Sequence, residues 1–144
     1  MVDRSQLFFP QPAGPGVHAG LLALRLVAGA AFIRHGLPKI QNPLGWMGSD
    51  SAMPAVLQAL AAVSEFGGGI AWMLGALTPL ASLGILATMT VAASKHIARG
   101  DPFVGKGGSY ELALVFSGVA LLLILAGPGR YSVDAWLRSR RAGR

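Results

Sequence analysis

The stretch VHAGLLALRLVAGAAFIRHGL, from Val17 to Leu37, decides the fold. It is an almost uninterrupted apolar block of about the 20 residues that a helix needs to cross ~30 Å of hydrocarbon. Similar blocks follow at residues 54–77, 79–97 and 109–126. Because backbone N–H and C=O groups find no water partners in lipid, each block is expected to be helical. The sequence therefore predicts an all-α, polytopic membrane protein, a bundle of four transmembrane helices.

The overall composition supports lipid as the surrounding medium. Hydrophobic residues make up 53% of the chain and charged residues only 12%, and the mean hydropathy is +0.54. A soluble domain carries about 25% charged residues. The net charge is +6, but five of the twelve basic residues lie between Arg130 and Arg144 rather than along a face with interleaved aromatics. We therefore expect the lipid bilayer, and no nucleic acid, as the partner of these charges.

The chain divides into an N-terminal tail at 1–16, a transmembrane domain at 17–129 and a basic C-terminal tail at 130–144. The first tail has no short apolar core followed by a small-residue cleavage site, so it is not expected to be a cleavable signal. Four crossings place both termini on one side. The basic tail, compared with a 78–79 connection that has no basic residue, predicts that this side is the cytoplasm. The expected location is the inner (cytoplasmic) membrane.

Residues at the block ends predict where the helices begin and end. Pro54 and Pro79 fit first-turn positions, and Thr78 and Ser109 are expected N-caps. Pro38 cannot donate to the carbonyl four residues before it, so the first helix is expected to end or kink there.

Several ionisable side chains lie within or at the ends of these apolar blocks. Such groups cost at least ~2.5–3.5 kcal/mol each in a membrane, so they normally face the bundle interior and pair. Glu65 is mid-helix and needs a partner from another helix, for which Arg25 is the best candidate by depth. The others can also be explained as helix-end residues that complement the helix dipole or reach the headgroups. The full set is Arg25, Arg34, His35, Lys39, Glu65, Lys95, His96 and Glu111.

Together these residues give the chain a recognisable pattern, which resembles the DoxX family over residues 18–137. The first part is LRLVAG at 24–29, followed by Phe32, His35, Gly36 and Lys39. The remaining parts are EFGGG at 65–69, KH at 95–96, GDPF at 100–103, YEL at 110–112 and GPGRYSVD at 127–134. The resemblance implies a four-helix membrane protein related to a subunit of a thiosulfate- and quinol-linked oxidoreductase, and to membrane partners of soluble redox enzymes.

Two functions are compatible with this reading. In the first, the bundle binds a quinone, which gains protons on reduction, and histidine exchanges protons near neutral pH unaided. The predicted catalytic residues are His35, Glu65, His96 and Glu111, and the predicted cofactor-binding residues are Arg25, His35, Lys39 and His96. In the second, the chain is a non-catalytic anchor or adaptor for a soluble or membrane redox enzyme.

Other readings of the sequence are weaker. A b-type haem between His35 and His96 is the least favoured cofactor, and no metal site is predicted. The chain has no cysteine, which excludes disulfides and any thiol redox step carried out by this chain alone. The sequence is also compatible with a homo-oligomer.

Overall fold

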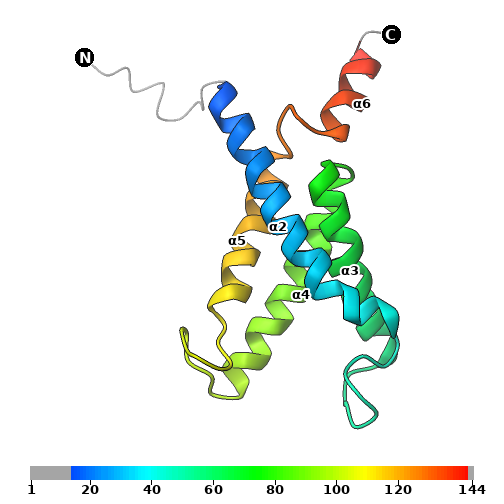
Figure 1. The fold of residues 1–144 in the computed structure, drawn as a ribbon, viewed down its shortest axis with the longest axis vertical. Helices are drawn as coiled ribbons and strands as arrows, with labels where there is room; N and C mark the ends of the chain where they lie inside the picture. Colours follow the sequence, from blue (N-terminus) through cyan, green and yellow to red (C-terminus); the bar gives the residue numbers. More distant parts are fainter. Residues whose placement is uncertain (1–13, 143–144) are drawn as a thin grey trace, which may run out of the picture.

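The computed structural model describes residues 14–142, and its regular elements are helices (Figure 1). Three helices are long and apolar enough to cross a membrane, and a fourth apolar helix is shorter, with 16 residues. The predicted fold class, an all-α polytopic membrane protein, is confirmed. The helices are α2 (Pro15–Gln41), α3 (Ala55–Leu74), α4 (Thr78–Ala98), α5 (Glu111–Ala126) and α6 (Val133–Ala142).

The chain runs up and down through the bundle. In Figure 1, α2 descends from the N-terminal end, α3 returns, α4 descends and α5 returns. The α3–α4 connection and α6 therefore lie at one end, and the connections at 42–54 and 99–110 lie at the other. We call these the α6 end and the loop end.

The helix bounds differ from the predicted ones in two informative places. α2 continues three residues past Pro38 to Gln41, because a proline so close to the helix C-terminus removes only one late hydrogen bond. α3 ends at Leu74, earlier than predicted, because Gly75 adopts the left-handed conformation that caps a helix, with φ 65° and ψ 40°.

Glycines allow α2 and α3 to pack with their backbones in contact. A Cβ atom added at Gly69 would lie 2.8 Å from the carbonyl oxygen of Gly29, and one at Gly36 would meet the backbone of Phe66. Because the hydrophobic effect does not drive helices together in lipid, close van der Waals packing of this kind stabilises the α2–α3 pair. By contrast, a Cβ at Gly67 would meet only Val63, at 4.0 Å. Of the glycines at 67–69, therefore, Gly69 is needed for the contact with α2, whereas Gly67 is not.

Aromatic side chains join the four apolar helices in the core. Phe32 of α2 packs edge-on against Trp72 of α3, with ring centroids 5.4 Å apart, and against Phe116 of α5 at 4.7 Å. The indole Nε1–H of Trp72 donates to the hydroxyl oxygen of Ser82 in α4 at 2.9 Å. Trp72, Phe32 and Ser82 are all buried, so this polar contact is made away from water.

The basic tail forms a helix, α6, which caps α4. The predicted N-cap, Thr78, lies inside the helix, and the N-cap position is occupied by Leu77. Instead the carboxylate of Asp134 accepts the N–H groups of Leu77 and Thr78, both at 2.9 Å. These bonds hold Leu77 in the left-handed region at φ 49°, where a non-glycine residue is strained. The prediction failed because the cap comes from a distant segment. Ser109 does not cap α5 either, since Tyr110 is the N-cap.

Acid should weaken the Asp134 cap. Burial alone would raise the pKa of Asp134, but hydrogen bonds from Thr78 and Leu77 outweigh it and hold the pKa below its ordinary value. The ionised cap therefore contributes its full stabilisation above about pH 3.9, which is the pKa of Asp in the unfolded chain. This stabilisation is lost as the pH falls through the lower pKa of the folded state.

We predict that Asp134→Ala lowers the free energy of unfolding by about 0.5–2 kcal/mol at pH 7. The difference from the unchanged protein should shrink below about pH 4. Detergent-solubilised protein unfolded by heat or denaturant at several pH values measures this, with Asp50→Ala in the exposed 42–54 connection as the control. An effect of Asp134→Ala that is the same at pH 3 and pH 7 would contradict the ionic cap.

Candidate functional site

A cavity of about 410 Å³ lies between α2, α3 and α4 near the loop end. Its size is in the range of small-molecule sites. Most of its wall is apolar, and exposed side chains such as Leu57, Leu60 and Val91 stand at its rim. In a membrane these rim residues face hydrocarbon, so the cavity is open to ligands dissolved in the bilayer. The polar or aromatic residues that line it are Lys39, Trp46, Gln58, Ser64, Glu65, Thr88 and Lys95.

The charged centre of the cavity is an ion pair between α2 and α3. The ammonium Nζ of Lys39 lies 2.6 Å from both carboxylate oxygens of Glu65. The Glu65 side chain is only 2% exposed, and that of Lys39 is 23% exposed. Lys39 also stands over the ring of Trp46, 4.5 Å from its centroid, a cation–π contact with the 42–54 connection.

The predicted pairing of Arg25 with Glu65 is wrong. The α2–α3 packing places Arg25 beside Gly75, since a Cβ there would fall on the guanidinium. Gly75 is ten residues beyond Glu65, or about 15 Å along a helix axis. The same antiparallel register brings Lys39 opposite Glu65. The depth argument placed both charges near the middle of the bilayer but could not supply this register, which depends on the glycine contacts.

Arg25 instead stabilises the α6 end. It is fully buried and donates through Nη2 to the backbone carbonyl of Tyr131 at 2.6 Å. Its other guanidinium nitrogens have no hydrogen-bond partner among the described residues. This contact ties the segment after α5 back to α2, far from the cavity. The structure therefore places Arg25, a predicted cofactor-binding residue, outside the cavity and in a contact that joins two segments of the chain.

Gln58 organises the rim of the cavity. Its side chain is buried and bonds to the backbone of Met53 (Nε2 to O, 2.9 Å) and Met47 (N to Oε1, 3.0 Å). Its own carbonyl accepts the indole N–H of Trp46 at 2.9 Å. Gln58 was not among the residues predicted from the sequence. The available signal was its position seven residues before Glu65, two turns along the same helix face.

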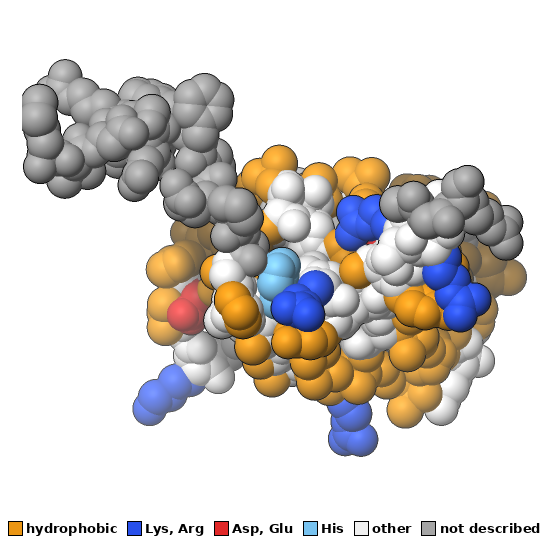
Figure 2. Space-filling model, turned by 90° about the horizontal axis from the view of Figure 1, so that it is seen from above, with side chains coloured by type: hydrophobic (Ala, Val, Ile, Leu, Met, Phe, Trp, Pro, Cys, Tyr) orange, Lys and Arg blue, Asp and Glu red, His pale blue; other side chains and the backbone are white. Residues whose placement is uncertain are grey.

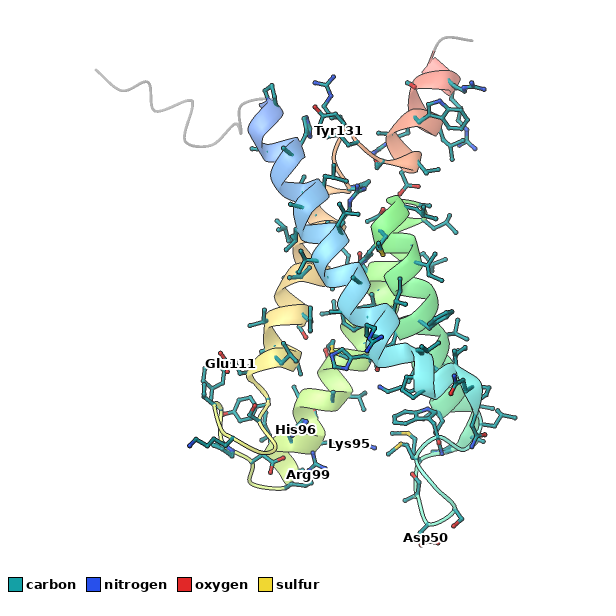
Figure 3. All side chains as sticks on the ribbon, in the orientation of Figure 1. Asp50, Lys95, His96, Arg99, Glu111 and Tyr131 are labelled. Carbon is teal, nitrogen blue, oxygen red and sulfur yellow. The ribbon has the colours of Figure 1, made fainter. Side chains whose placement is uncertain are left out.

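Three further predicted residues, His35, His96 and Glu111, do not line the cavity. Figure 3 shows Lys95, His96, Arg99 and Glu111 at the loop end of the bundle, with Tyr131 at the opposite end. His96 Nδ1 is 2.7 Å from Asp101 Oδ2, which Arg99 also approaches at 3.3 Å. His35 and Glu111 are exposed. The structure thus brings together Lys39, Glu65 and Lys95, and it separates His35, His96 and Glu111 from them.

The chemistry available in the cavity is proton exchange and hydrogen bonding. A lysine ammonium offers up to three donors and a carboxylate only acceptors, so the pair can hold a polar head group and move protons to or from it. Within residues 14–142, no three histidine, cysteine or acidic side chains lie close enough together to hold a metal ion.

The fold and cavity define a class: polytopic helical membrane proteins with an ion pair between two helices in a cavity that opens toward lipid. Comparison with known proteins narrows this, because the DoxX family profile matches residues 20–97. The chain belongs to the DoxX family.

Two curated relatives match over most of their length. The chain is 31% identical to Inner membrane protein YqjF of Escherichia coli over 126 residues, covering 84% of this chain and 94% of the relative. It is also 31% identical to an uncharacterized protein of Haemophilus influenzae over 117 residues, covering 79% and 87%. No solved structure is significantly similar.

We predict strong coupling between Lys39 and Glu65. Lys39→Met alone leaves a buried carboxylate without its counter-charge and should cost about 3–5 kcal/mol of stability, whereas Lys39→Met with Glu65→Leu should recover much of that loss. Unfolding of the purified protein in detergent measures each variant, with Lys106→Met in the exposed 99–110 connection as a control. Single-variant losses that simply add in the double variant would show that the pair is not coupled.

Proposed function

We propose that this chain is an inner-membrane subunit of a redox system that binds a quinone or quinol in the α2–α3–α4 cavity and works with a partner oxidoreductase. The location is supported by YqjF, which is named an inner membrane protein. The observation that carries the ligand proposal is the cavity itself. It combines an apolar wall open to lipid with a buried carboxylate that is paired with a partly exposed ammonium.

The residues present suit a quinone head group. Such a ring has two carbonyl oxygens that accept hydrogen bonds, and two donors line the cavity, Lys39 from α2 and Lys95 from α4. Trp46 supplies an aromatic surface beside Lys39, against which a flat ring can stack. The apolar rim of Leu57, Leu60 and Val91 offers a path for a hydrocarbon tail to remain in the bilayer.

A quinone takes up two electrons and two protons when it is reduced. In this proposal the electrons come from the partner oxidoreductase, because the chain has no cysteine with which to carry a thiol step itself. Lys39 orients the head group through Nζ–H. Glu65, held 2.6 Å from the same nitrogen, accepts or returns a proton through its carboxylate oxygens. Gln58 positions Trp46 and the 42–54 connection over the cavity.

Our proposal uses fewer of the predicted residues for binding and proton exchange. Lys39 and Glu65 retain the roles predicted from the sequence, and Lys95 and Trp46 are added. His35 and Glu111 are exposed and His96 is bonded to Asp101, so the proposal does not use them at the cavity.

We predict that a quinone co-purifies with the protein and that filling the cavity removes it. Ala87 lines the cavity, so Ala87→Phe should lower the affinity for an added short-chain quinone roughly tenfold, which corresponds to ~1.4 kcal/mol. Solvent extraction followed by chromatography measures the retained quinone, and equilibrium dialysis measures the affinity.

Two matched controls make this test specific. Ala30→Phe adds the same ring at an exposed position of α2 outside the cavity and should change nothing. Lys95→Gln should weaken binding, whereas Lys106→Gln, at an exposed loop position, should not. If no quinone is retained or bound, and a redox enzyme nevertheless co-purifies with the chain, the adaptor function replaces this proposal.

The orientation is part of the proposal. Positive charge after Arg130 favours a cytoplasmic α6 end, which places the cavity in the outer half of the membrane. The chain has no native cysteine, so single cysteines report cleanly. We predict that Ser49→Cys reacts with a membrane-impermeant thiol reagent in intact cells and that Ser139→Cys on α6 reacts only after the membrane is opened. The reverse pattern would invert the orientation.

A further inference from the structure

A second cavity, of about 470 Å³, lies at the α6 end between the start of α4, the end of α5 and α6. We call it the α6 groove. α4 begins at Thr78 and α5 ends at Ala126, so the groove lies where the apolar helices stop. In a bilayer this is the boundary between hydrocarbon and headgroups. Figure 2 looks onto this end and shows Lys and Arg side chains beside exposed apolar surface.

One face of α6 supplies the charge of the groove. Asp134, Leu137, Arg138 and Arg141 all line it, and their spacing of three and four residues places them on the same side of a helix. Arg140 lies on another side of α6, where its guanidinium stacks over the ring of Trp136 at 4.1 Å. The arginines of α6 are therefore divided between the groove and the outer surface.

Among the described residues that line the groove, Asp134 is the acidic one, and its carboxylate already has hydrogen-bond partners. It accepts the N–H groups of Leu77 and Thr78, and Arg25 and Arg138 both provide nearby positive charge. Arg138 and Arg141 therefore leave the groove with an excess of positive charge. Guanidinium groups bind phosphate oxygens well, because two N–H groups can donate in parallel.

The opposite wall of the groove is apolar and exposed. Leu77 is 67% exposed and Leu125 is 76% exposed, and Pro79 and Ile124 complete this wall. An acidic peptide or free phosphate would satisfy the arginines but would leave this wall without a partner. A ligand that joins a phosphate to hydrocarbon chains satisfies both walls.

We propose that the α6 groove binds an anionic glycerophospholipid. Its phosphate contacts Arg138 and Arg141, and its acyl chains lie along Leu125 and Ile124 toward the bilayer. The site is independent of the quinone proposal, since it is at the other end of the bundle and shares no residue with the first cavity.

Native mass spectrometry of the full chain in detergent tests this site with added phosphatidylglycerol or phosphatidylcholine. We expect phosphatidylglycerol to bind preferentially. Arg138→Gln with Arg141→Gln should weaken its binding roughly tenfold or more, because each arginine near the membrane surface contributes about fivefold. The matched control, Arg130→Gln with Arg140→Gln, removes the same charge from residues that do not line the groove and should leave binding nearly unchanged.

Three results would overturn the proposal. Equal weakening by the control double variant would mean that diffuse surface charge attracts the lipid. Displacement of the lipid by inorganic phosphate at similar concentrations would mean that the arginines hold a free anion. Equal binding of phosphatidylcholine would remove the role of the charge. A melting curve for each variant keeps the test valid, because a binding loss counts only where the melting temperature is unchanged.

Discussion

The ion pair between Lys39 and Glu65 is the constraint on which the rest of the structure depends. An ionised carboxylate that is 2% exposed inside a membrane bundle is costly without a counter-charge, and the register of α2 against α3 places Lys39 beside it. The glycine contacts at Gly29, Gly36 and Gly69 set that register. The cavity then forms around the pair, because α4 contributes Gly84 and Ala87, which are too small to fill the space beside it.

The two ends of the bundle have different physical characters. At the loop end the polar groups surround a cavity and leave an accessible site. At the α6 end two charged groups, Arg25 and Asp134, instead join segments that are far apart in sequence. Arg25 binds the backbone after α5, and Asp134 binds the start of α4. Arg25 and Glu65 are both charged residues within apolar blocks of the sequence, yet Arg25 bonds at the α6 end and Glu65 pairs at the loop end.

Hydropathy was sufficient to predict the fold class, because lipid permits few ways to satisfy a backbone. Helix ends were less predictable: Gly75 has a local signal, whereas the Asp134 cap on α4 depends on a residue far away in sequence. For the site, the mid-helix position of Glu65 correctly indicated a partner on another helix, but the identity of that partner required the register. His35 and His96 illustrate the limit, since residue type and depth alone do not tell which face of a helix is turned inward.

The close α2–α3 contact has a consequence for how the chain enters the membrane. Glu65 alone would carry a bare carboxylate into hydrocarbon, at a cost of ~2.5–3.5 kcal/mol on insertion scales. The short 42–54 connection lets α2 and α3 enter as one antiparallel hairpin, with Lys39 already neutralising Glu65. We therefore expect the α2–α3 hairpin, rather than each helix alone, to be the unit that inserts into the membrane.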